Sequence, residues 1–158
     1  MRLLLAIISL TFASSAAFAV DFRWTLGFGQ GTLEAKIENG NDSHVNIFCP
    51  RWQTETTPGM FINVKRINPQ RDELVTAQII IDGKNYSFYL KEIEFLADTR
   101  AGMWQFREFV RALASSKQKS FVVEFPKYNT TETFSLLDAR KTLGLGEHSM
   151  LKGCDKGD

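Results

Sequence analysis

Between residues 22 and 90, segments in which apolar and polar residues alternate recur along the chain, and this pattern constrains the fold more than any other feature. In the first such segment, Phe22, Trp24, Leu26 and Phe28 are separated by polar residues or glycine. A period of two is that of a half-buried β-strand. Similar reasoning predicts further strands at residues 33–37, 45–49, 60–67, 75–81 and 86–90. The sequence therefore predicts a β-sheet built from this part of the chain.

Turn sequences separate these strands. Residues 39–42 (Asn-Gly-Asn-Asp) are predicted to form a hairpin turn, since Asn and Gly tolerate the positive φ of a type I′ turn. Residues 82–85 (Asp-Gly-Lys-Asn) are predicted to form the turn of a second hairpin. Residues 29–31 (Gly-Gln-Gly) are also predicted to reverse the chain. Short turns of this kind join antiparallel strands. The three isoleucines at 79–81 are apolar on both faces, which predicts a central strand.

The period changes to that of a helix near residue 98. Asp98 or Thr99 can cap the N-terminus of this helix, which we expect to end near Lys117. Its predicted apolar face contains Met103, Phe106, Phe109, Val110, Leu113 and Ala114. Short strands are predicted at 121–125 and 131–134, and residues 135–138 have the form of a capping box for a helix that ends near Leu143. The predicted fold class is α+β, a mostly antiparallel sheet (a sandwich or partial barrel) with one main helix and a short C-terminal helix.

The first 19 residues have the pattern of a signal peptide. Arg2 precedes an apolar stretch, and residues 17–19 (Ala-Phe-Ala) form a small-x-small cleavage signal. We expect residues 20–158 to be a single exported domain, periplasmic or secreted; an uncleaved anchor is the alternative. The whole chain has 19 basic and 18 acidic residues, so removing the signal leaves no net charge. This balance argues against nucleic-acid binding by bulk charge.

Two cysteines, Cys49 and Cys154, fit an oxidising compartment. We predict one disulfide between them, which would close a loop of about 100 residues and contribute roughly 4–5 kcal/mol in the chain-entropy model. The alternative is a Cys2His2 zinc site with His44 and His148, although the spacing matches no zinc finger. We therefore expect no metal and no cofactor.

The sequence contains no local catalytic motif. His44 and His148, the two histidines, do not accompany a GxSxG nucleophile motif, and the glycines at 27, 29 and 31 precede a strand pattern, which does not fit a dinucleotide site. We expect a protein that is not an enzyme. A hydrolase with carboxylates from distant strands remains as an alternative.

One surface of the main helix is the candidate binding site. At 100° per residue, Trp104, Arg100, Arg107 and Arg111 fall within an arc of about 60° beside the apolar face. Tryptophan supplies a rigid apolar anchor and arginine binds carboxylates or phosphates. The competing interpretation is that Trp104 covers a sheet edge with an arginine stacked on its ring. Trp52 is a second candidate.

Three short phrases lie within a region from about Met60 to Cys154: Ile-Ile-Ile-Asp-Gly at 79–83, Phe-Val-Arg-Ala-Leu at 109–113 and Phe-Ser-Leu-Leu-Asp-Ala at 134–139. Together with the order of elements, these phrases resemble the invasion-associated locus B family of small exported bacterial proteins. The resemblance implies a periplasmic or surface β-rich protein without known catalysis, and it assigns no functional residue. The family usually has more cysteines than this chain.

These features predict a non-enzymatic binding protein of the bacterial envelope, with a role in virulence or host interaction as a further expectation. Its partner would be another protein or an anionic envelope component, without nucleic acid and without stable membrane insertion after signal cleavage. The first alternative is a periplasmic inhibitor or immunity protein that blocks a lysozyme-like or toxin enzyme. Such a protein would insert a loop, either residues 50–59 or residues 39–43. The second alternative is the hydrolase.

Overall fold

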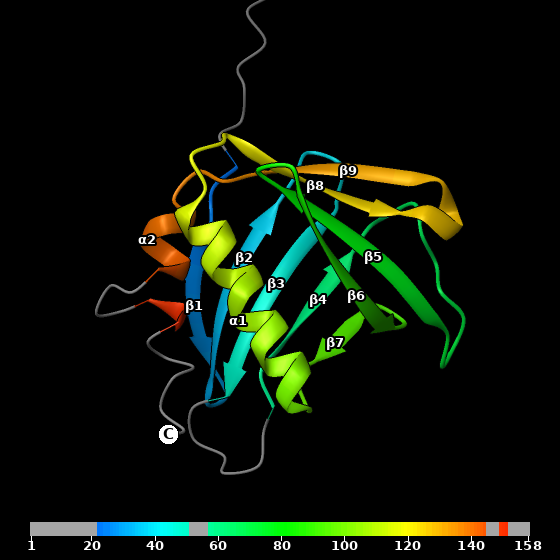
Figure 1. Cartoon of the computed structure of the whole chain (residues 1–158), viewed down its shortest axis with the longest axis horizontal. Helices are drawn as coiled ribbons and strands as arrows, with labels where there is room; N and C mark the ends of the chain where they lie inside the picture. Colours follow the sequence, from blue (N-terminus) through cyan, green and yellow to red (C-terminus); the bar gives the residue numbers. More distant parts are fainter. Residues whose placement is uncertain (1–21, 51–56, 145–148, 152–158) are drawn as a thin grey trace, which may run out of the picture.

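A computed structural model describes residues 22–50, 57–144 and 149–151. Within these ranges, nine strands form one sheet in the order β1-β2-β3-β4-β7-β6-β5-β8-β9 (Figure 1). The strands are β1 (Thr25–Gly29), β2 (Thr32–Glu38), β3 (His44–Pro50), β4 (Gly59–Asn63), β5 (Leu74–Ile81), β6 (Lys84–Lys91), β7 (Glu94–Leu96), β8 (Ser120–Phe125) and β9 (Thr130–Ser135). The helices are α1 (Arg100–Ser115), α2 (Ala139–Leu143) and the 3₁₀ turn η1 (Pro126–Tyr128).

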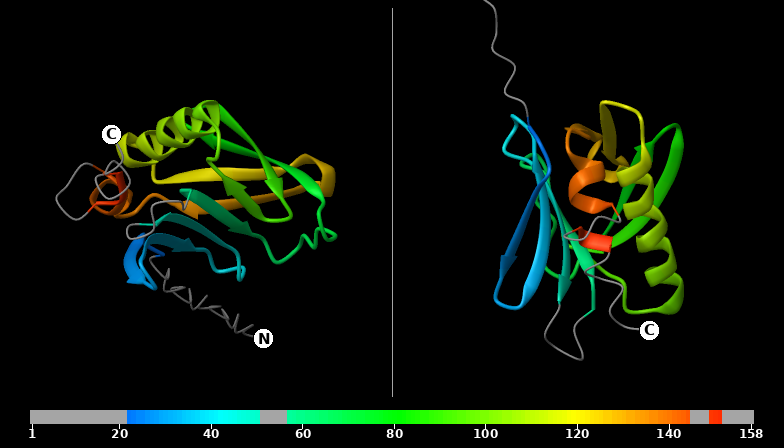
Figure 2. Two further views of the ribbon diagram at one scale, coloured as in Figure 1. Left: turned by 90° about the horizontal axis from the view of Figure 1, so that it is seen from below. Right: turned by 90° about the vertical axis from the view of Figure 1, so that its left-hand side faces the viewer.

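The sheet is antiparallel and open. Neighbouring strands pair antiparallel throughout the described ranges, and β1 and β9 are the two edges of the sheet. The sheet bends so that β9 approaches β2, and α1 and α2 pack beside each other against the same layer (Figures 1 and 2). The predicted α+β class, with one main helix and one short C-terminal helix, is confirmed. The single bent sheet corresponds to the partial barrel of the two forms considered, and it does not close.

All three segments predicted to turn the chain join antiparallel strands, and two of them are two-residue turns. Gln30 and Gly31 have φ of 49° and 82°, and Asp82 and Gly83 have φ of 51° and 77°, so each pair makes a two-residue hairpin turn. The turn between β2 and β3 is longer than predicted, because β2 ends at Glu38 and β3 begins at His44. Within it, only Asp42 has positive φ.

An asparagine side chain explains this longer turn. The Asn39 Oδ1 atom accepts hydrogen bonds from the backbone N–H groups of Asn41 (3.0 Å) and Ser43 (3.3 Å). The Asn39 N–H donates to the Ser43 carbonyl at 3.0 Å. Side-chain bonds of this kind let Asn replace the backbone pairing of a tight hairpin. The type I′ prediction for this segment was therefore wrong.

Three further boundaries differ from the sequence-based prediction. The strand predicted at 60–67 ends at Asn63, and β7 was missed because three residues are too few to show a period. The capping box at 135–138 is absent. Asp138 precedes α2 with φ of 63° and makes no side-chain cap, while the Ser135 hydroxyl accepts from the Leu137 N–H at 3.0 Å. Gly144 ends α2 as predicted.

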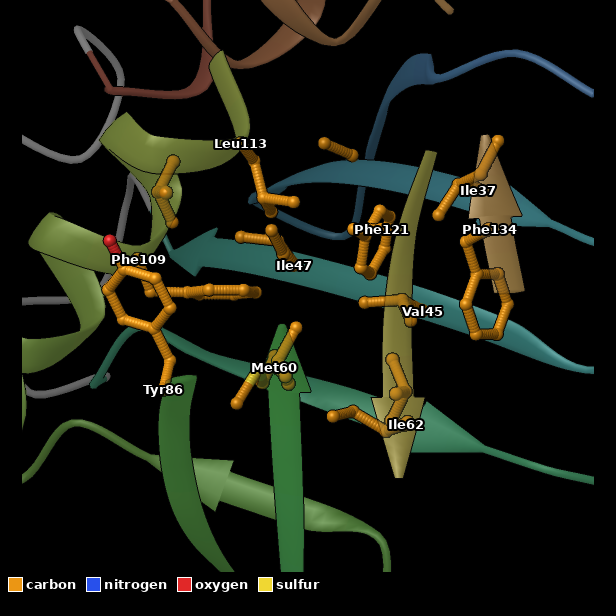
Figure 3. Packing of buried hydrophobic residues seen from close by; sticks show 14 of the residues in the cluster. Ile37, Val45, Ile47, Met60, Ile62, Tyr86, Phe109, Leu113, Phe121 and Phe134 are labelled. Atoms are coloured by element: carbon orange, nitrogen blue, oxygen red, sulfur yellow. The ribbon is translucent and has the colours of Figure 1, made fainter. Parts of the chain in front are cut away.

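The core lies between the concave side of the sheet and the two helices. Figure 3 shows side chains from α1 and from strands near both ends of the strand order, such as β2 and β9, pointing into one shared space. The Phe109 ring of α1 contacts Tyr86 (centroids 6.1 Å apart) and Phe88 (5.1 Å) of β6. Residues 79–81 lie in β5, between β6 and β8, so the predicted central strand is confirmed.

Strand β1 departs from the predicted half-buried pattern. Leu26 and Phe28 lie opposite the buried residues Ala35 and Leu33 of β2, so they are on the core side of the sheet. They are nevertheless 38% and 56% exposed. An edge strand has a neighbour on one side only, and the alternation in sequence does not reveal which strand is at the edge.

Among the described helices, none has the length and apolarity needed to span a membrane.

The loop before β5 is tied to η1 by a charged cluster that predicts a pH effect. The Glu73 Oε1 atom accepts from Lys127 Nζ and from the Tyr128 hydroxyl, both at 2.6 Å. These bonds lower the pKa of Glu73 from 4.5 to about 2, chiefly through Lys127. A carboxyl with a depressed folded-state pKa stabilises the fold above its unfolded pKa, and this contribution is lost as the pH falls towards 2.

We therefore expect Glu73→Gln to lower the melting temperature at pH 6 and to have progressively less effect between pH 4.5 and pH 2. Thermal unfolding of both proteins across this pH range measures the difference. A difference that stays constant down to pH 2 would contradict the assignment.

Candidate functional site

The outer side of α1 carries the predicted binding residues. Thr99 caps the helix, because its hydroxyl accepts from the Gly102 N–H at 3.0 Å. The opposite side of α1 is buried through Phe106, Phe109, Val110, Leu113 and Ala114. Met103, which the helical period also placed on this face, is only half-buried. The helix is thus fixed in rotation, and the exposed residues Arg100, Trp104 and Arg111 lie away from this buried side.

Trp104 is 67% exposed, although tryptophan is one of the largest apolar side chains. The neighbouring Gln105 makes the contact with the sheet instead, through a hydrogen bond from its Nε2 atom to the Ser87 carbonyl at 2.6 Å. The cation–π contacts between described residues involve Lys84 on Tyr86 and Lys127 on Tyr128, and none involves Trp104. About two thirds of the indole is therefore open to solvent, and no cation–π contact with an arginine of the described part of the chain involves it.

The three arginines differ in their surroundings. Arg100 and Arg111 are exposed, and Arg107 is half-buried. Arg111 forms an ion pair with Glu108 one turn earlier, with Nη1 and Oε1 3.1 Å apart. The helix has three arginines and one glutamate, so it carries a net charge of +2. We refer to Trp104, Arg100, Arg107 and Arg111 together as the α1 patch.

Some predicted residues cannot be placed. Trp52, His148 and Cys154 lie outside the described residues. Cys49 is 1% exposed in β3, and the described ranges contain no free cysteine thiol. The disulfide to Cys154 stays a prediction. Within the same ranges, no group of three or more His, Cys, Asp and Glu side chains is arranged to hold a metal ion.

A hollow of about 420 Å³ beside the β2–β3 turn was not anticipated from the sequence. It is lined by Phe22, Glu38, Asn39, Gly40, Asp42, Ser43 and His44. The hollow brings together two carboxylates and a histidine, which is a combination that acid–base catalysis uses. No periodicity signals it, because its residues come from the N-terminal segment, a turn and two strand ends.

Electrostatics in the hollow do not suit a general acid. A hydrogen bond from Lys36 lowers the pKa of Glu38, and one from Lys65 lowers the pKa of Asp42. Burial and the nearby Lys36 charge lower the pKa of His44. A glycosidase-type acid requires a carboxyl whose pKa is raised, so that it holds its proton near neutral pH. The hollow therefore offers no support for the hydrolase alternative.

A buried carboxylate holds the β2–β3 turn against β9. Glu132 is 4% exposed, and its Oε2 atom accepts hydrogen bonds from Asn39 Nδ2 (2.9 Å) and Asn41 Nδ2 (3.0 Å). Its Oε1 atom is buried without a hydrogen-bond partner among the described residues. The turn at residues 39–43, one of the two loops proposed for an inhibitor, is thus held against the sheet. The other loop proposed for an inhibitor includes residues 51–56, which lie outside the described ranges.

Comparisons with known proteins identify the family of this chain. No curated protein and no solved structure matches the chain. The match to a family model provides no link to the invasion-associated locus B family, so that resemblance stays a prediction. The family model described as YfjT matches residues 22–143, which is most of the chain and covers β1 to α2. The chain therefore belongs to the YfjT family.

Proposed function

We propose that this protein is a non-enzymatic, exported binding protein of the bacterial envelope that docks an acidic surface of a partner protein on the α1 patch. The observation that carries the proposal is the exposure of Trp104 on a helix whose other face is fixed in the core. The signal-like segment at residues 1–19 supports export.

The chemistry of the patch favours a protein partner. Tryptophan and arginine are enriched among the residues that contribute most to protein–protein binding. Tryptophan combines a large contact area with few side-chain torsions, and arginine combines a large contact area with several hydrogen-bond donors. Trp104 has the apolar area, and 67% of its surface is exposed. Burying it against a partner would remove this area from water at no cost to the fold.

Charge identifies the kind of partner surface. Arg100 is exposed and has no ion pair with another described residue, and the helix carries a net charge of +2 on a domain with no net charge. A local basic surface on a molecule without net charge attracts acidic partners in one orientation, since the rest of the surface does not compete for the acidic groups. Arginine also binds carboxylates in a bidentate geometry that lysine does not provide.

The test is affinity capture from envelope extract with variants of the patch. We expect Trp104→Ala and Arg100→Glu each to reduce recovery of the bound partner about tenfold or more, which corresponds to a loss of about 1.4 kcal/mol or more. Tyr89→Ala is the matched control, since Tyr89 is 71% exposed on β6 and lies outside the patch. The melting temperature of all three variants should stay close to that of the parent protein.

Recovery that is unchanged in both patch variants would overturn the proposal. Binding to vesicles of anionic phospholipid, lost in Arg100→Glu and absent from neutral vesicles, would replace the protein partner by a lipid surface.

A further inference from the structure

Strand β1 presents an open edge to solvent. It pairs with β2 on one side, it is at the end of the sheet, and all five of its residues are exposed. Natural proteins protect such edges with charged residues, proline, bulges or a covering element, because unpaired N–H and C=O groups attract another strand. The sequence of β1, Thr-Leu-Gly-Phe-Gly, contains no charge and no proline, and no described element covers it.

The hairpin turn determines which groups face outward. Gln30 and Gly31 form a two-residue turn, so the closing pair Gly29 and Thr32 is hydrogen-bonded between β1 and β2. In an antiparallel pair, alternate residues direct both backbone groups to the same neighbour. Leu26 and Phe28 therefore direct their N–H and C=O groups to the open edge. These two residues also carry the exposed apolar side chains of the strand.

We propose that two copies of this protein pair antiparallel through β1, around a two-fold axis that passes through Gly27. In this register, Leu26 of one copy lies opposite Phe28 of the second copy, and the reverse pair is identical by symmetry. Both pairs are of the hydrogen-bonded type, so four backbone bonds form. If the axis passed through Leu26 or Phe28 instead, only the pair on the axis would be formed by these two outward-facing residues, so fewer backbone bonds would form between them.

The side chains fit this arrangement on both faces. On the concave face, Leu26 and Phe28 meet across the axis, which covers apolar side chains that are 38% and 56% exposed in one copy. On the convex face, Gly27 meets Gly27, and no Cβ atom obstructs the approach. A residue on a two-fold axis lies opposite the same residue of the second copy, so a charged residue there would repel its counterpart. Strand β1 contains no charged residue.

The proposed interface is separate from the α1 patch. Figure 2 shows β1 and α1 on opposite sides of the molecule in both views. Pairing through β1 would therefore leave Trp104 exposed in each copy, and a dimer would present two α1 patches. This inference does not depend on the proposed function.

The first test is sedimentation of the purified protein over a range of concentrations. We expect the dimer fraction to rise between about 1 and 100 µM, a range that interfaces of modest size reach. Phe28→Lys should keep the protein monomeric over this range, because it places a charge opposite an apolar partner near the axis. Tyr89→Lys, which introduces the same charge at an equally exposed aromatic residue, should leave the dimer intact.

The second test reports the register. Gly27→Cys should form an intermolecular disulfide on mild oxidation, since the two Cα atoms would lie about 4.5 Å apart in a non-hydrogen-bonded pair. Thr25→Cys is the control: Thr25 would lie opposite Gly29, about 14 Å from its own copy. A cysteine at 27 meets no atom within 4 Å, so the variant should fold.

A protein that stays monomeric at 100 µM would overturn the proposal. A dimer that persists in Phe28→Lys, or equal cross-linking in both cysteine variants, would do the same.

Discussion

Replacing Trp24 with alanine is expected to lower the free energy of unfolding by about 3–5 kcal/mol, the usual cost of removing a large buried aromatic side chain. Trp24 is 2% exposed, and its ring stacks on Phe121 of β8 with centroids 6.3 Å apart. Its indole N–H donates to the Ser135 carbonyl at 3.1 Å. Equilibrium denaturation in guanidinium chloride measures the change.

The effect is large because the Trp24 indole joins the start of β1 to β8 and β9, which no strand pairing links to it. The backbone of Trp24, which alanine would keep, makes two further contacts. Its backbone N–H donates to the Leu137 carbonyl at 3.0 Å, and its carbonyl accepts from the Thr142 hydroxyl at 3.3 Å. The residue thereby fixes the start of β1 to the segment after β9 and to α2. Since the sheet does not close, these contacts hold its two ends near each other.

Trp24→Phe separates packing from hydrogen bonding. Phenylalanine keeps most of the apolar contact and removes the indole N–H, so we expect a smaller loss of about 1–2 kcal/mol. If Trp24→Ala costs less than about 1 kcal/mol, the ends of the sheet are held by other contacts.

The second large effect is expected for Asn39→Asp. This substitution keeps the oxygen that organises the β2–β3 turn and replaces the amide that donates to Glu132 at 2.9 Å by a second carboxylate oxygen. Two carboxylates would then face each other in a site where Glu132 is almost completely buried. We expect a loss of about 3 kcal/mol or more near neutral pH, because two carboxylates would repel each other in a largely buried site and only Asn41 would still donate to Glu132.

Glu132→Gln gives the matched test of the same contact. Glutamine keeps an acceptor for Asn39 and Asn41 and removes the buried charge, so we expect a change of at most about 1 kcal/mol in either direction. In the double variant Asn39→Asp/Glu132→Gln, the new amide can donate to the new carboxylate, so part of the loss should be recovered. Denaturant unfolding of the three variants yields the coupling free energy. Additive effects would show that Asn39 and Glu132 do not interact in solution.

Local features of the chain were predicted well where the apolar periodicity or a turn residue determines the backbone conformation. The helix with Thr99 as one of two predicted caps, the turn at Asp82 and Gly83, and the central strand containing Ile80 all follow from neighbouring residues. The hairpin predicted at residues 39–42 is present, but its turn is not of type I′, because the side chain of Asn39 binds the backbone two and four residues later. Such a choice depends on contacts with β9 that the local sequence does not contain.

The same distinction applies to the candidate site. The helical period alone places Trp104 and the three arginines on one face, because angles within a single helix are fixed by geometry. That Gln105 takes the sheet contact and leaves Trp104 exposed depends on the rotation of α1 against β6. The buried contact of Glu132 with Asn39 joins residues 93 positions apart, so no pattern along the chain could reveal it.

The sequence by itself determined most of the strands, the main helix, the antiparallel class and the composition of the α1 patch, because these depend on periods of two and 3.6 residues and on the turn residues between them. It did not reveal β7, which is too short to show a period. The tertiary structure alone decided that β1 is an open edge with Leu26 and Phe28 exposed, and that the ends of the sheet meet through Trp24 and Glu132. Strand order and sheet curvature arise from contacts between distant residues, and alternation along a strand is the same whether it lies at the centre or at the edge.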